Sequence, residues 1–451
     1  MAFRSFLELV THFGETAPDH PALLYERGGE KAVMTSRTLM ERIISSAETF
    51  RGKRCVGFLI GESTVDTVIA LFGAVTSGAR VVLFDEAIPE DVLGKLIRLT
   101  GADTLFGDED LVSALKPYCP KPRIDGKGEM LFFTSGTTNR AKAVVLTEQS
   151  LLRSAWNGSS LLPLAPDDTL LLSLPLSHVF GVVCGLLWGL CSGAAVAIGR
   201  GPRHYADDFL FFRPTAVSLV PLLIGFLLKY RVFNPELKLV LIGAGDCPKE
   251  YIGALRSLGI RVSFGYGLTE TSSGVALSLG DDPYAFTICP DFEVSIADDG
   301  EILIKSPETM MQGYYLRPED TRAVLIDGVL HTGDLGSIDE NGKLHVTGRK
   351  KEMIVLPDGT KIFLPEYEAA LIGATGEPNL AVELKDGALT LVIYDKAGTK
   401  DEILKKIRPV TEQYPRGQQI RKIILTSDPL PRTATGKLKR YEIEQIGEKE
   451  S

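Results

Sequence analysis

A run of hydroxyl-bearing residues follows an apolar segment in the first third of the chain. Residues 130–133 (MLFF) are typical of a buried strand and lead directly into residues 134–142 (TSGTTNRAK). Four hydroxyls, a glycine and Lys142 supply O–H and N–H donors and one cation, which are the groups that bind a polyphosphate. The segment is not the G-x-x-x-x-G-K-[ST] phosphate loop, because no glycine precedes Lys142 and no hydroxyl follows it. A polar surface turn stays open as the alternative, since Ser, Thr and Gly also favour turns.

A second segment, residues 264–271 (FGYGLTET), follows a predicted strand at residues 261–264. We expect this segment to form one loop in which Tyr266 offers an aromatic face, Thr269 a hydroxyl and Glu270 a carboxylate. These three groups suit a purine ring, a phosphate and a cation.

Three charged residues further along the chain extend the set. Asp334, within residues 331–336 (HTGDLG), is suited to accept hydrogen bonds from both hydroxyls of a ribose. Arg349 is suited to bind nucleotide hydroxyls or phosphate, and Lys437 ends a glycine-containing loop, residues 431–437 (PRTATGK). A hairpin turn around Asp334 and a solvated basic face around Lys437 stay open as alternatives.

In order and rough spacing, these segments resemble the adenylate-forming superfamily of acyl-CoA synthetases, peptide-synthetase adenylation domains and beetle luciferases. The resemblance runs from about residue 15 to residue 440 and is closest to the fatty-acyl-CoA synthetases. Five segments carry it: residues 133–138 (FTSGTT), 266–270 (YGLTE), 332–335 (TGDL), 348–351 (GRKK) and 431–437 (PRTATGK).

The resemblance implies a nucleotide-binding role at each of these positions. The loop that would close over the β- and γ-phosphates of ATP comprises Thr134, Ser135, Gly136, Thr137, Thr138 and Lys142. Tyr266 and Gly267 would hold the adenine, and Thr269 would contact the α-phosphate. Glu270 and Thr137 would hold Mg²⁺.

The resemblance also implies where the acid reacts. Asp334 and Arg349 would bind the ribose, and His178 would lie beside the acyl group. Lys437 would bridge the attacking carboxylate and the α-phosphate, where a positioned cation stabilises the transition state. Lys351 would be the hinge about which a small domain rotates to admit a thiol, or else an exposed linker lysine.

The phosphate loop departs from the family pattern at three positions. The family usually has glycine at Asn139, proline at Ala141 and glycine at Ala143. Asn tolerates a left-handed backbone better than most residues, so Asn139 is compatible with the turn. The two alanines predict weaker ATP binding.

The residues around His178 bear on the acid. Amino-acid-activating members carry an aspartate near this position, whereas residues 174–181 (LPLSHVFG) contain no acid, which disfavours an amino-acid substrate. Phe180-Gly181 and residues 311–315 (MQGYY) favour a fatty or other apolar acid, with residues 219–223 and Val275 as pocket walls. Simple core packing explains those apolar residues equally well.

Three functions follow from these observations. The first is ATP-dependent activation of a fatty or other apolar acid to an acyl-adenylate, followed by transfer to coenzyme A. The second transfers an acyl or aryl group to the phosphopantetheine thiol of a carrier protein. The third, motivated by Asn139, Ala141 and Ala143, is a nucleotide-binding protein without catalysis.

The spacing of apolar segments predicts an α/β protein of two domains. Short strands alternate with helices up to about residue 286, which predicts parallel sheets covered by helices. Strands separated by Asp-Gly and Asn-Gly turns then predict a small β-barrel-like section. We expect a large ATP- and acyl-binding domain over residues 1–349 and a small, mobile α+β lid domain over residues 350–451 that carries Lys437.

The bulk properties of the 451-residue chain set limits on its partners. A net charge of −9 argues against general nucleic-acid binding, which needs Lys and Arg to replace phosphate counterions. Six scattered cysteines without a CxxC pair, and a first segment unlike a signal peptide, favour the cytoplasm. Residues 170–199 are long and apolar, but the glycines and Pro175 within them favour strand, helix and strand over a membrane span. The oligomeric state stays open.

Overall fold

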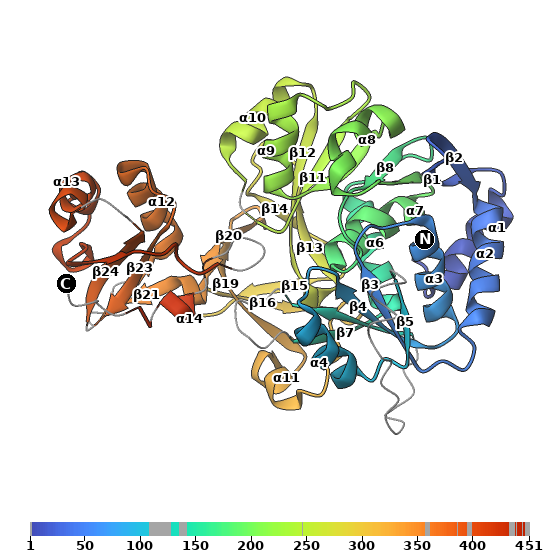
Figure 1. Ribbon diagram of the computed structural model, residues 1–451, viewed down its shortest axis with the longest axis horizontal. Coiled ribbons are helices and arrows are strands. Elements are labelled where there is room, and N and C mark those ends of the chain that lie inside the picture. Colours follow the sequence, from blue (N-terminus) through green and yellow to red (C-terminus); the bar gives the residue numbers. More distant parts are fainter. Residues whose placement is uncertain are drawn as a thin grey trace.

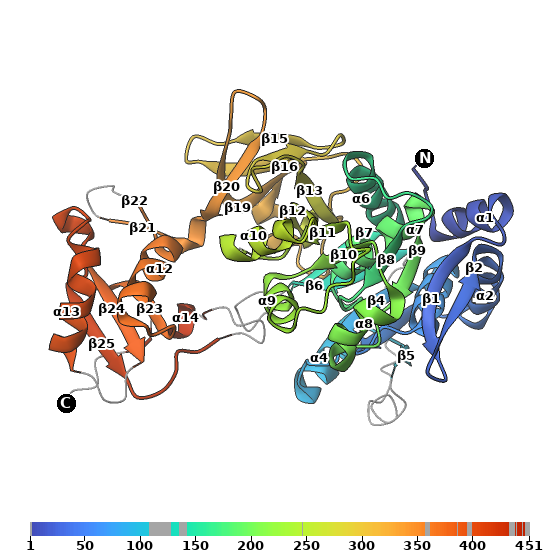
Figure 2. The ribbon, with the colours of Figure 1, turned by 90° about the horizontal axis from the view of Figure 1, so that it is seen from above.

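The structure is a computed structural model that describes most of the chain. The described residues are 2–107, 128–134, 142–245, 247–356, 361–385, 387–394, 399–432, 438, 440–443 and 445–446. Figures 1 and 2 show the last strands and helices, from α12 on, at one end of an elongated molecule. Helices α1, α2 and α3 lie together at the opposite end.

The largest sheet is organised around β12 (Arg261–Leu268), because the two halves of this strand pair differently. Its first half runs parallel to β11 (Leu239–Ile242), and its second half runs antiparallel to β13 (Ser273–Ser278). Beyond β11 the order is β10 (Ala216–Leu219), β8 (Thr169–Leu172), β9 (Ala195–Ile198), β1 (Pro21–Arg27) and β2 (Glu30–Thr35). Beyond β13 the order is β14 (Phe286–Ile288), β20 (Leu344–Arg349), β19 (Val329–Ile338), β16 (Glu301–Lys305) and β15 (Glu293–Ile296), with β18 (Leu325–Ile326) beside β19.

A second sheet carries the two ends of the predicted phosphate loop. Its strands, in spatial order, are β5 (Thr104–Phe106), β3 (Cys55–Ile60), β4 (Arg80–Asp85), β6 (Glu129–Phe133), β7 (Ala143–Thr147) and β17 (Gly313–Tyr314). The first four are parallel, and β7 and β17 are antiparallel to their neighbours. β3 and β4 are buried over almost their whole length, as expected of parallel strands covered on both faces.

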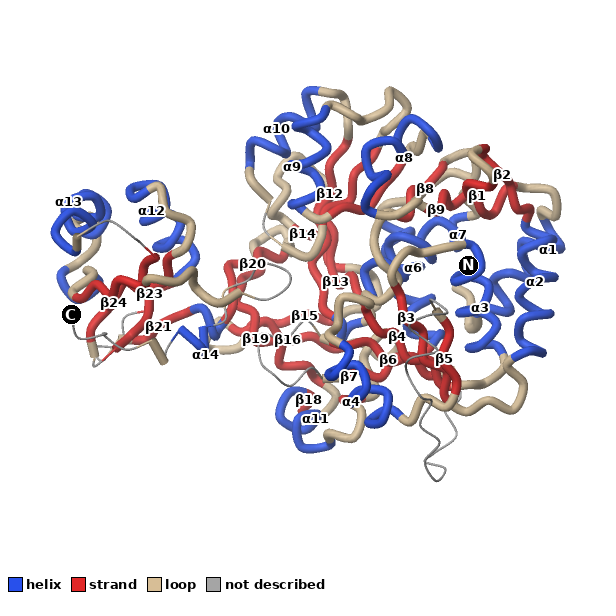
Figure 3. Tube along the Cα trace, viewed as in Figure 1, coloured by secondary structure: helices blue, strands red, loops and turns tan. Residues whose placement is uncertain are grey.

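Helices cover these sheets (Figure 3). Thr64 and Thr147 each cap a helix with a side-chain oxygen, which explains why α3 and α6 begin where they do. The α-helices up to β20 are α1 (Phe6–Thr16), α2 (Ser36–Thr49), α3 (Val65–Thr76), α4 (Glu90–Thr100), α6 (Glu148–Leu161), α7 (Trp188–Ser192), α8 (Tyr205–Phe212), α9 (Pro221–Tyr230), α10 (Lys249–Ser257) and α11 (Pro318–Val324). Other helical elements are the π-helix η1 (Gly181–Leu187) and the 3₁₀ turns η2 (Pro202–His204) and η3 (Thr269–Thr271).

The last hundred residues have a core of their own. The main cluster of buried apolar side chains runs from Phe3 to Leu344, and the next cluster along the chain begins at Leu356. The strands here are β21 (Met353–Val355), β22 (Lys361–Phe363), β23 (Leu380–Lys385), β24 (Ala388–Tyr394) and β25 (Lys422–Thr426). The helical elements are η4 (Lys350–Glu352), α12 (Leu364–Thr375), α13 (Lys400–Thr411), η5 (Arg416–Gln418) and α14 (Arg440–Ile443).

The predicted α/β class is confirmed, with one local correction. Residues 265–268 were expected in a loop, but they continue β12, because their backbone pairs with β13. Only Thr269–Thr271 forms a turn. The apolar residues 170–199 fold as β8, η1, α7 and β9, and among the described residues no helix is long and apolar enough to cross a membrane.

Candidate functional site

Three of the predicted nucleotide residues, one each from β12, β19 and β20, contact one another in the structure. The Tyr266 hydroxyl donates a hydrogen bond to Asp334 Oδ2 at 3.0 Å, and Arg349 Nε lies 3.1 Å from Asp334 Oδ1. Asp334 and Arg349 are direct partners in the antiparallel ladder between β19 and β20. The strand register, rather than a loop, therefore brings the carboxylate and the guanidinium together.

Burial sets the electrostatics of this cluster. The Asp334 side chain is 6% exposed, whereas that of Arg349 is 57% exposed. Burial, and then the neighbouring Asp334 carboxylate, raise the pKa of Tyr266 well above its usual range, so the phenol remains a hydrogen-bond donor at neutral pH. The cluster presents a carboxylate, a partly exposed cation and an aromatic ring, which suits a ribose beside a flat base.

Thr269 and Glu270 lie in the turn that directly follows β12, the strand that carries Tyr266. A β-bulge lies between Tyr266 and Gly267, and a Cβ added at Gly267 would lie 1.8 Å from the Ser273 carbonyl oxygen. Only glycine fits there without moving the backbone. The close approach of the two strands fixes the position of the 3₁₀ turn, which begins at Thr269.

Glu270 contacts Tyr314, a residue that the sequence indicated only as part of the segment 311–315. The Tyr314 hydroxyl donates to Glu270 Oε1 at 2.7 Å. The backbone N–H of Met311 donates to the Glu270 carbonyl at 2.8 Å, so two hydrogen bonds join the turn to residues 311–314. Lys142 Nζ lies 4.5 Å from the centre of the Tyr314 ring and 3.3 Å from Asp320 Oδ1.

Thr134 and Lys142 close the mouth of the predicted phosphate loop. The Thr134 N–H donates to the Lys142 carbonyl at 3.0 Å, and the Lys142 N–H donates to Thr134 Oγ1 at 3.4 Å. Antiparallel β6 and β7 bring these two ends together. The remaining predicted loop residues, Ser135, Gly136, Thr137 and Thr138, lie outside the described residues.

His178 lies near the carboxyl end of β4. His178 Nε2 is 3.5 Å from Asp85 Oδ2, and the Ser177 hydroxyl donates to the same oxygen at 2.9 Å. Sequence reasoning missed Asp85, although its position directly after the apolar strand Arg80–Phe84 was a usable signal. Polar residues at the carboxyl ends of parallel strands commonly face a ligand crevice.

The apolar residues proposed as pocket walls lie in different surroundings. Leu219 and Val275 belong to the main core, whereas Leu222 is 83% exposed. A cavity of about 30 Å³ lies instead between α6, η1, α7 and the strands β11 and β13. It is lined by Cys184, Gly274 and Cys289 among other residues, and by Ser154, whose buried hydroxyl has no partner within the described part of the chain.

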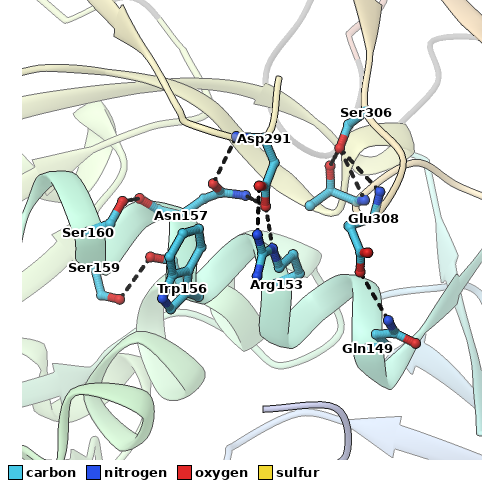
Figure 4. Close-up of polar contacts among 10 residues, drawn as sticks. Gln149, Arg153, Trp156, Asn157, Ser159, Ser160, Asp291, Ser306 and Glu308 are labelled. Atoms are coloured by element: carbon cyan, nitrogen blue, oxygen red, sulfur yellow. Dashed lines mark hydrogen bonds and ion pairs between the residues drawn. The ribbon is translucent and has the colours of Figure 1, made fainter. Parts of the chain in front are cut away.

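Helix α6, which borders this cavity, is fastened to the antiparallel side of the large sheet (Figure 4). Arg153 pairs with Asp291, with Nη2 at 2.7 Å from Oδ1, and Asn157 Nδ2 donates to Asp291 Oδ2 at 3.0 Å. The Arg153 and Asn157 side chains, one helical turn apart, point to the same carboxylate. Local sequence patterns do not indicate this contact, because Arg153 and Asp291 are 138 residues apart in the chain.

Of the predicted hinge and catalytic lysines, only the hinge residue Lys351 lies within the described residues. Lys351 is exposed in η4, and its neighbour Lys350 makes the ion pairs, with Nζ at 2.6 Å from Asp299 Oδ2 and 3.0 Å from Glu301 Oε2. Lys437 lies outside the described residues. No three His, Cys, Asp or Glu side chains gather as a metal-binding group in the part of the chain that the structure describes.

Comparison with known proteins bears on the family of the chain. The family described as AMP-binding enzyme matches residues 129–315. A 2-succinylbenzoate–CoA ligase of Bacillus cytotoxicus is 30% identical over 344 residues, which cover 70% of this chain and 69% of the relative. A long-chain-fatty-acid–CoA ligase of Mycobacterium tuberculosis is 26% identical over 412 residues, which cover 85% of this chain and 79% of the relative.

A solved structure extends the likeness to the whole fold. The O-succinylbenzoate coenzyme A synthetase of Bacillus subtilis, solved in complex with AMP, has a TM-score of 0.81 at 22% identity. The superposition covers 98% of this chain and 99% of that protein, so the fold is shared from end to end. Taken with the matched family and the Bacillus cytotoxicus relative, this shows that the chain belongs to the AMP-binding enzyme family, the adenylate-forming superfamily that its five motifs resemble.

Proposed function

We propose that this protein activates a carboxylic acid with ATP to form an acyl-adenylate, releases pyrophosphate, and transfers the acyl group to coenzyme A. The expected enzyme class, an ATP-dependent acid–thiol ligase that forms AMP, follows from the family. The observation that carries the proposal is the cluster of Tyr266, Asp334 and Arg349, which come from three strands and provide the groups that a nucleoside requires.

Five of the described site residues are proposed to hold the nucleotide in the first step. Asp334 and Arg349 bind the ribose, Tyr266 and Gly267 border the adenine, and Thr269 contacts the α-phosphate. With the nucleotide fixed, the acid's carboxylate attacks the α-phosphorus in line and pyrophosphate leaves. Positioning and charge neutralisation supply most of the catalysis in such transfers.

Mg²⁺ is the metal that this reaction implies, and the residues present fit it. Glu270 offers hard carboxylate oxygens, and the described residues contain no ready-made metal cage. Mg²⁺ typically binds through one or two carboxylates together with the substrate's phosphates, so a single protein carboxylate at this position is in keeping with its chemistry. Bound there, Mg²⁺ would neutralise charge on the phosphates. Thr137 is proposed as its second contact.

The acid is proposed to be compact in shape. The 30% identical relative named 2-succinylbenzoate–CoA ligase supports an aryl acid as the first candidate. Relatives act on both kinds, as the names 2-succinylbenzoate–CoA ligase and long-chain-fatty-acid–CoA ligase state. A fatty acid therefore remains the second candidate.

Coenzyme A is the proposed acceptor, because the named relatives are CoA ligases. The thiol of a carrier protein is the alternative acceptor that the test below includes.

Residues 1–349 are proposed to bind ATP and the acid. Residues 350–451 are proposed to carry Lys437 as a lid that rotates about Lys351. Free thiols at the five described cysteines support a reducing setting such as the cytoplasm.

A pyrophosphate-release screen tests the proposal. Aryl acids, short acids and fatty acids of increasing length are each offered with ATP and Mg²⁺, alone and with coenzyme A or a phosphopantetheinylated carrier protein. We expect acid-dependent release that yields a thioester with coenzyme A. If none of the acids in the panel causes pyrophosphate release, the protein binds nucleotide without catalysis. If a thioester forms on the carrier protein but not on coenzyme A, the carrier protein is the acceptor.

A further inference from the structure

Tyr314 contacts two of the residues that the sequence predicts to bind Mg²⁺ and the phosphates of ATP, Glu270 and Lys142, through two different parts of its side chain. Its hydroxyl donates to Glu270 Oε1 at 2.7 Å, and its ring face lies 4.5 Å from Lys142 Nζ. The residue is 9% exposed. One buried side chain thus sets the separation between the carboxylate proposed for Mg²⁺ and the ammonium proposed for the phosphates.

The backbone around Tyr314 is fixed from two directions. β17 pairs with β7, and Tyr314 lies opposite Val144, two residues after Lys142. The Tyr314 N–H also donates to Thr321 Oγ1 at 2.9 Å, which connects the strand to α11. Contacts at its backbone, hydroxyl and ring leave the Tyr314 side chain little conformational freedom. Tyr314 is therefore suited to orient Glu270 and Lys142, because little of its conformational entropy remains to be lost when they bind a ligand.

Asp320, on the same helix α11, neutralises Lys142. Its Oδ1 lies 3.3 Å from Lys142 Nζ, and its Oδ2 lies 3.2 Å from Arg317 Nη1. A polyphosphate that approached Lys142 would have to compete with this carboxylate. Asp320 would retain Arg317 after the exchange, so no charge would be left without a partner.

We propose that Tyr314 is a positioning residue that orients Glu270 and Lys142 for Mg²⁺·ATP, and that Asp320 is the carboxylate that the phosphates displace from Lys142. The inference rests on the proposed function and adds two residues to it. It requires substitutions at the two positions to change the affinity for Mg²⁺·ATP in opposite directions. A loss of structural integrity would not produce opposite signs.

Isothermal titration calorimetry with Mg²⁺·ATP, with ATP in EDTA, and with AMP tests both parts. Tyr314→Phe removes the donor to Glu270 and keeps the ring over Lys142, so affinity for Mg²⁺·ATP should fall about tenfold or more. Affinity for ATP in EDTA should stay within about twofold, because the ring–cation contact remains. Asp320→Asn should raise affinity for ATP, with or without Mg²⁺, roughly two- to fivefold, the worth of a part-exposed ion pair. Neither change should alter AMP binding.

Tyr315→Phe is the matched control, because Tyr315 is adjacent in sequence but its hydroxyl lies 3.3 Å from Arg80 Nη1, away from Glu270. It should leave all three affinities unchanged. Equal losses for Mg²⁺·ATP, ATP and AMP in Tyr314→Phe would overturn the positioning role. Unchanged or weaker ATP binding in Asp320→Asn would overturn the displacement. A wild-type protein that binds neither ATP nor AMP would instead refute the proposed function itself.

Discussion

Glu148 gives the fold a pH dependence that can be worked out from its surroundings. It is the first residue of α6, and its Oε2 accepts a hydrogen bond from the Phe6 N–H at 2.8 Å. Phe6 is fully buried and stacks on Phe72 at 4.3 Å between ring centres. Burial, opposed by the Phe6 hydrogen bond, raises the pKa of Glu148 from an ordinary 4.5 to about 7.

The sign follows from proton binding. Between pH 4.5 and about 7 the folded protein holds a proton on Glu148 that the unfolded chain has released, so stability falls as the pH rises through this window. The stabilisation is complete below pH 4.5 and is lost above pH 7. The difference, 7 − 4.5 = 2.5 pH units, multiplied by about 1.4 kcal/mol per unit, is on the order of 3 kcal/mol.

Glu148→Gln should remove this dependence, because the amide is neutral at every pH and its oxygen still accepts from Phe6. Urea unfolding at pH 5, 6, 7 and 8 should show the variant matching the wild type at pH 5. At pH 8 it should exceed the wild type by roughly 3 kcal/mol in free energy of unfolding. Glu308→Gln, at an exposed carboxylate bonded to Gln149, is the control and should leave the profile unchanged. Parallel pH profiles for wild type and Glu148→Gln would refute the reasoning.

Three further outcomes are expected. Asp334→Asn should lower the affinity for both ATP and AMP by about tenfold or more in calorimetry, because it weakens hydrogen bonds to a charged group. A loss of affinity for ATP alone would contradict the ribose role. Arg80→Met should lower the free energy of unfolding by about 3 kcal/mol, because it leaves Glu129, now 2.6 Å from Arg80, without its cation. In denaturant unfolding, Arg80→Met/Glu129→Leu should recover much of that loss, and no recovery would contradict the pairing. Lys437→Ala should abolish adenylate formation but leave thioester formation from supplied acyl-adenylate largely intact, and equal loss of both half-reactions would contradict the lid rotation.

Local patterns in the sequence were sufficient to predict many elements of the fold. Residues 90–100 and 400–411 each have apolar residues at helical spacing, and both segments form helices with those bounds. Thr399 and Glu402 form a capping box at the second of these, a signal carried by residues three apart. The alternation of strands and helices likewise predicted the α/β class, since each element buries its own apolar face.

The corrections come from pairing between distant segments. Residues 265–268 are rich in glycine and suggested a loop, yet β13 extends β12 through them by pairing with its second half. Asp85 escaped notice because its closeness to His178 depends on β4 and the segment after β8 lying together, 93 residues apart in the chain. Sequence patterns that report on near neighbours contain no information on such contacts.

The sequence by itself determined the family, because each of the five motifs is a short contiguous segment. Such segments, and their order along the chain, can be recognised without knowledge of the fold. Only the tertiary structure decided what those motifs contact. Tyr266 reaches Asp334 across 68 residues, and Glu270 reaches Tyr314 across 44, through strand pairings whose register depends on the packing of whole sheets. The physical reason is that a hydrogen bond between distant side chains depends on the position of two backbones, which no single segment specifies.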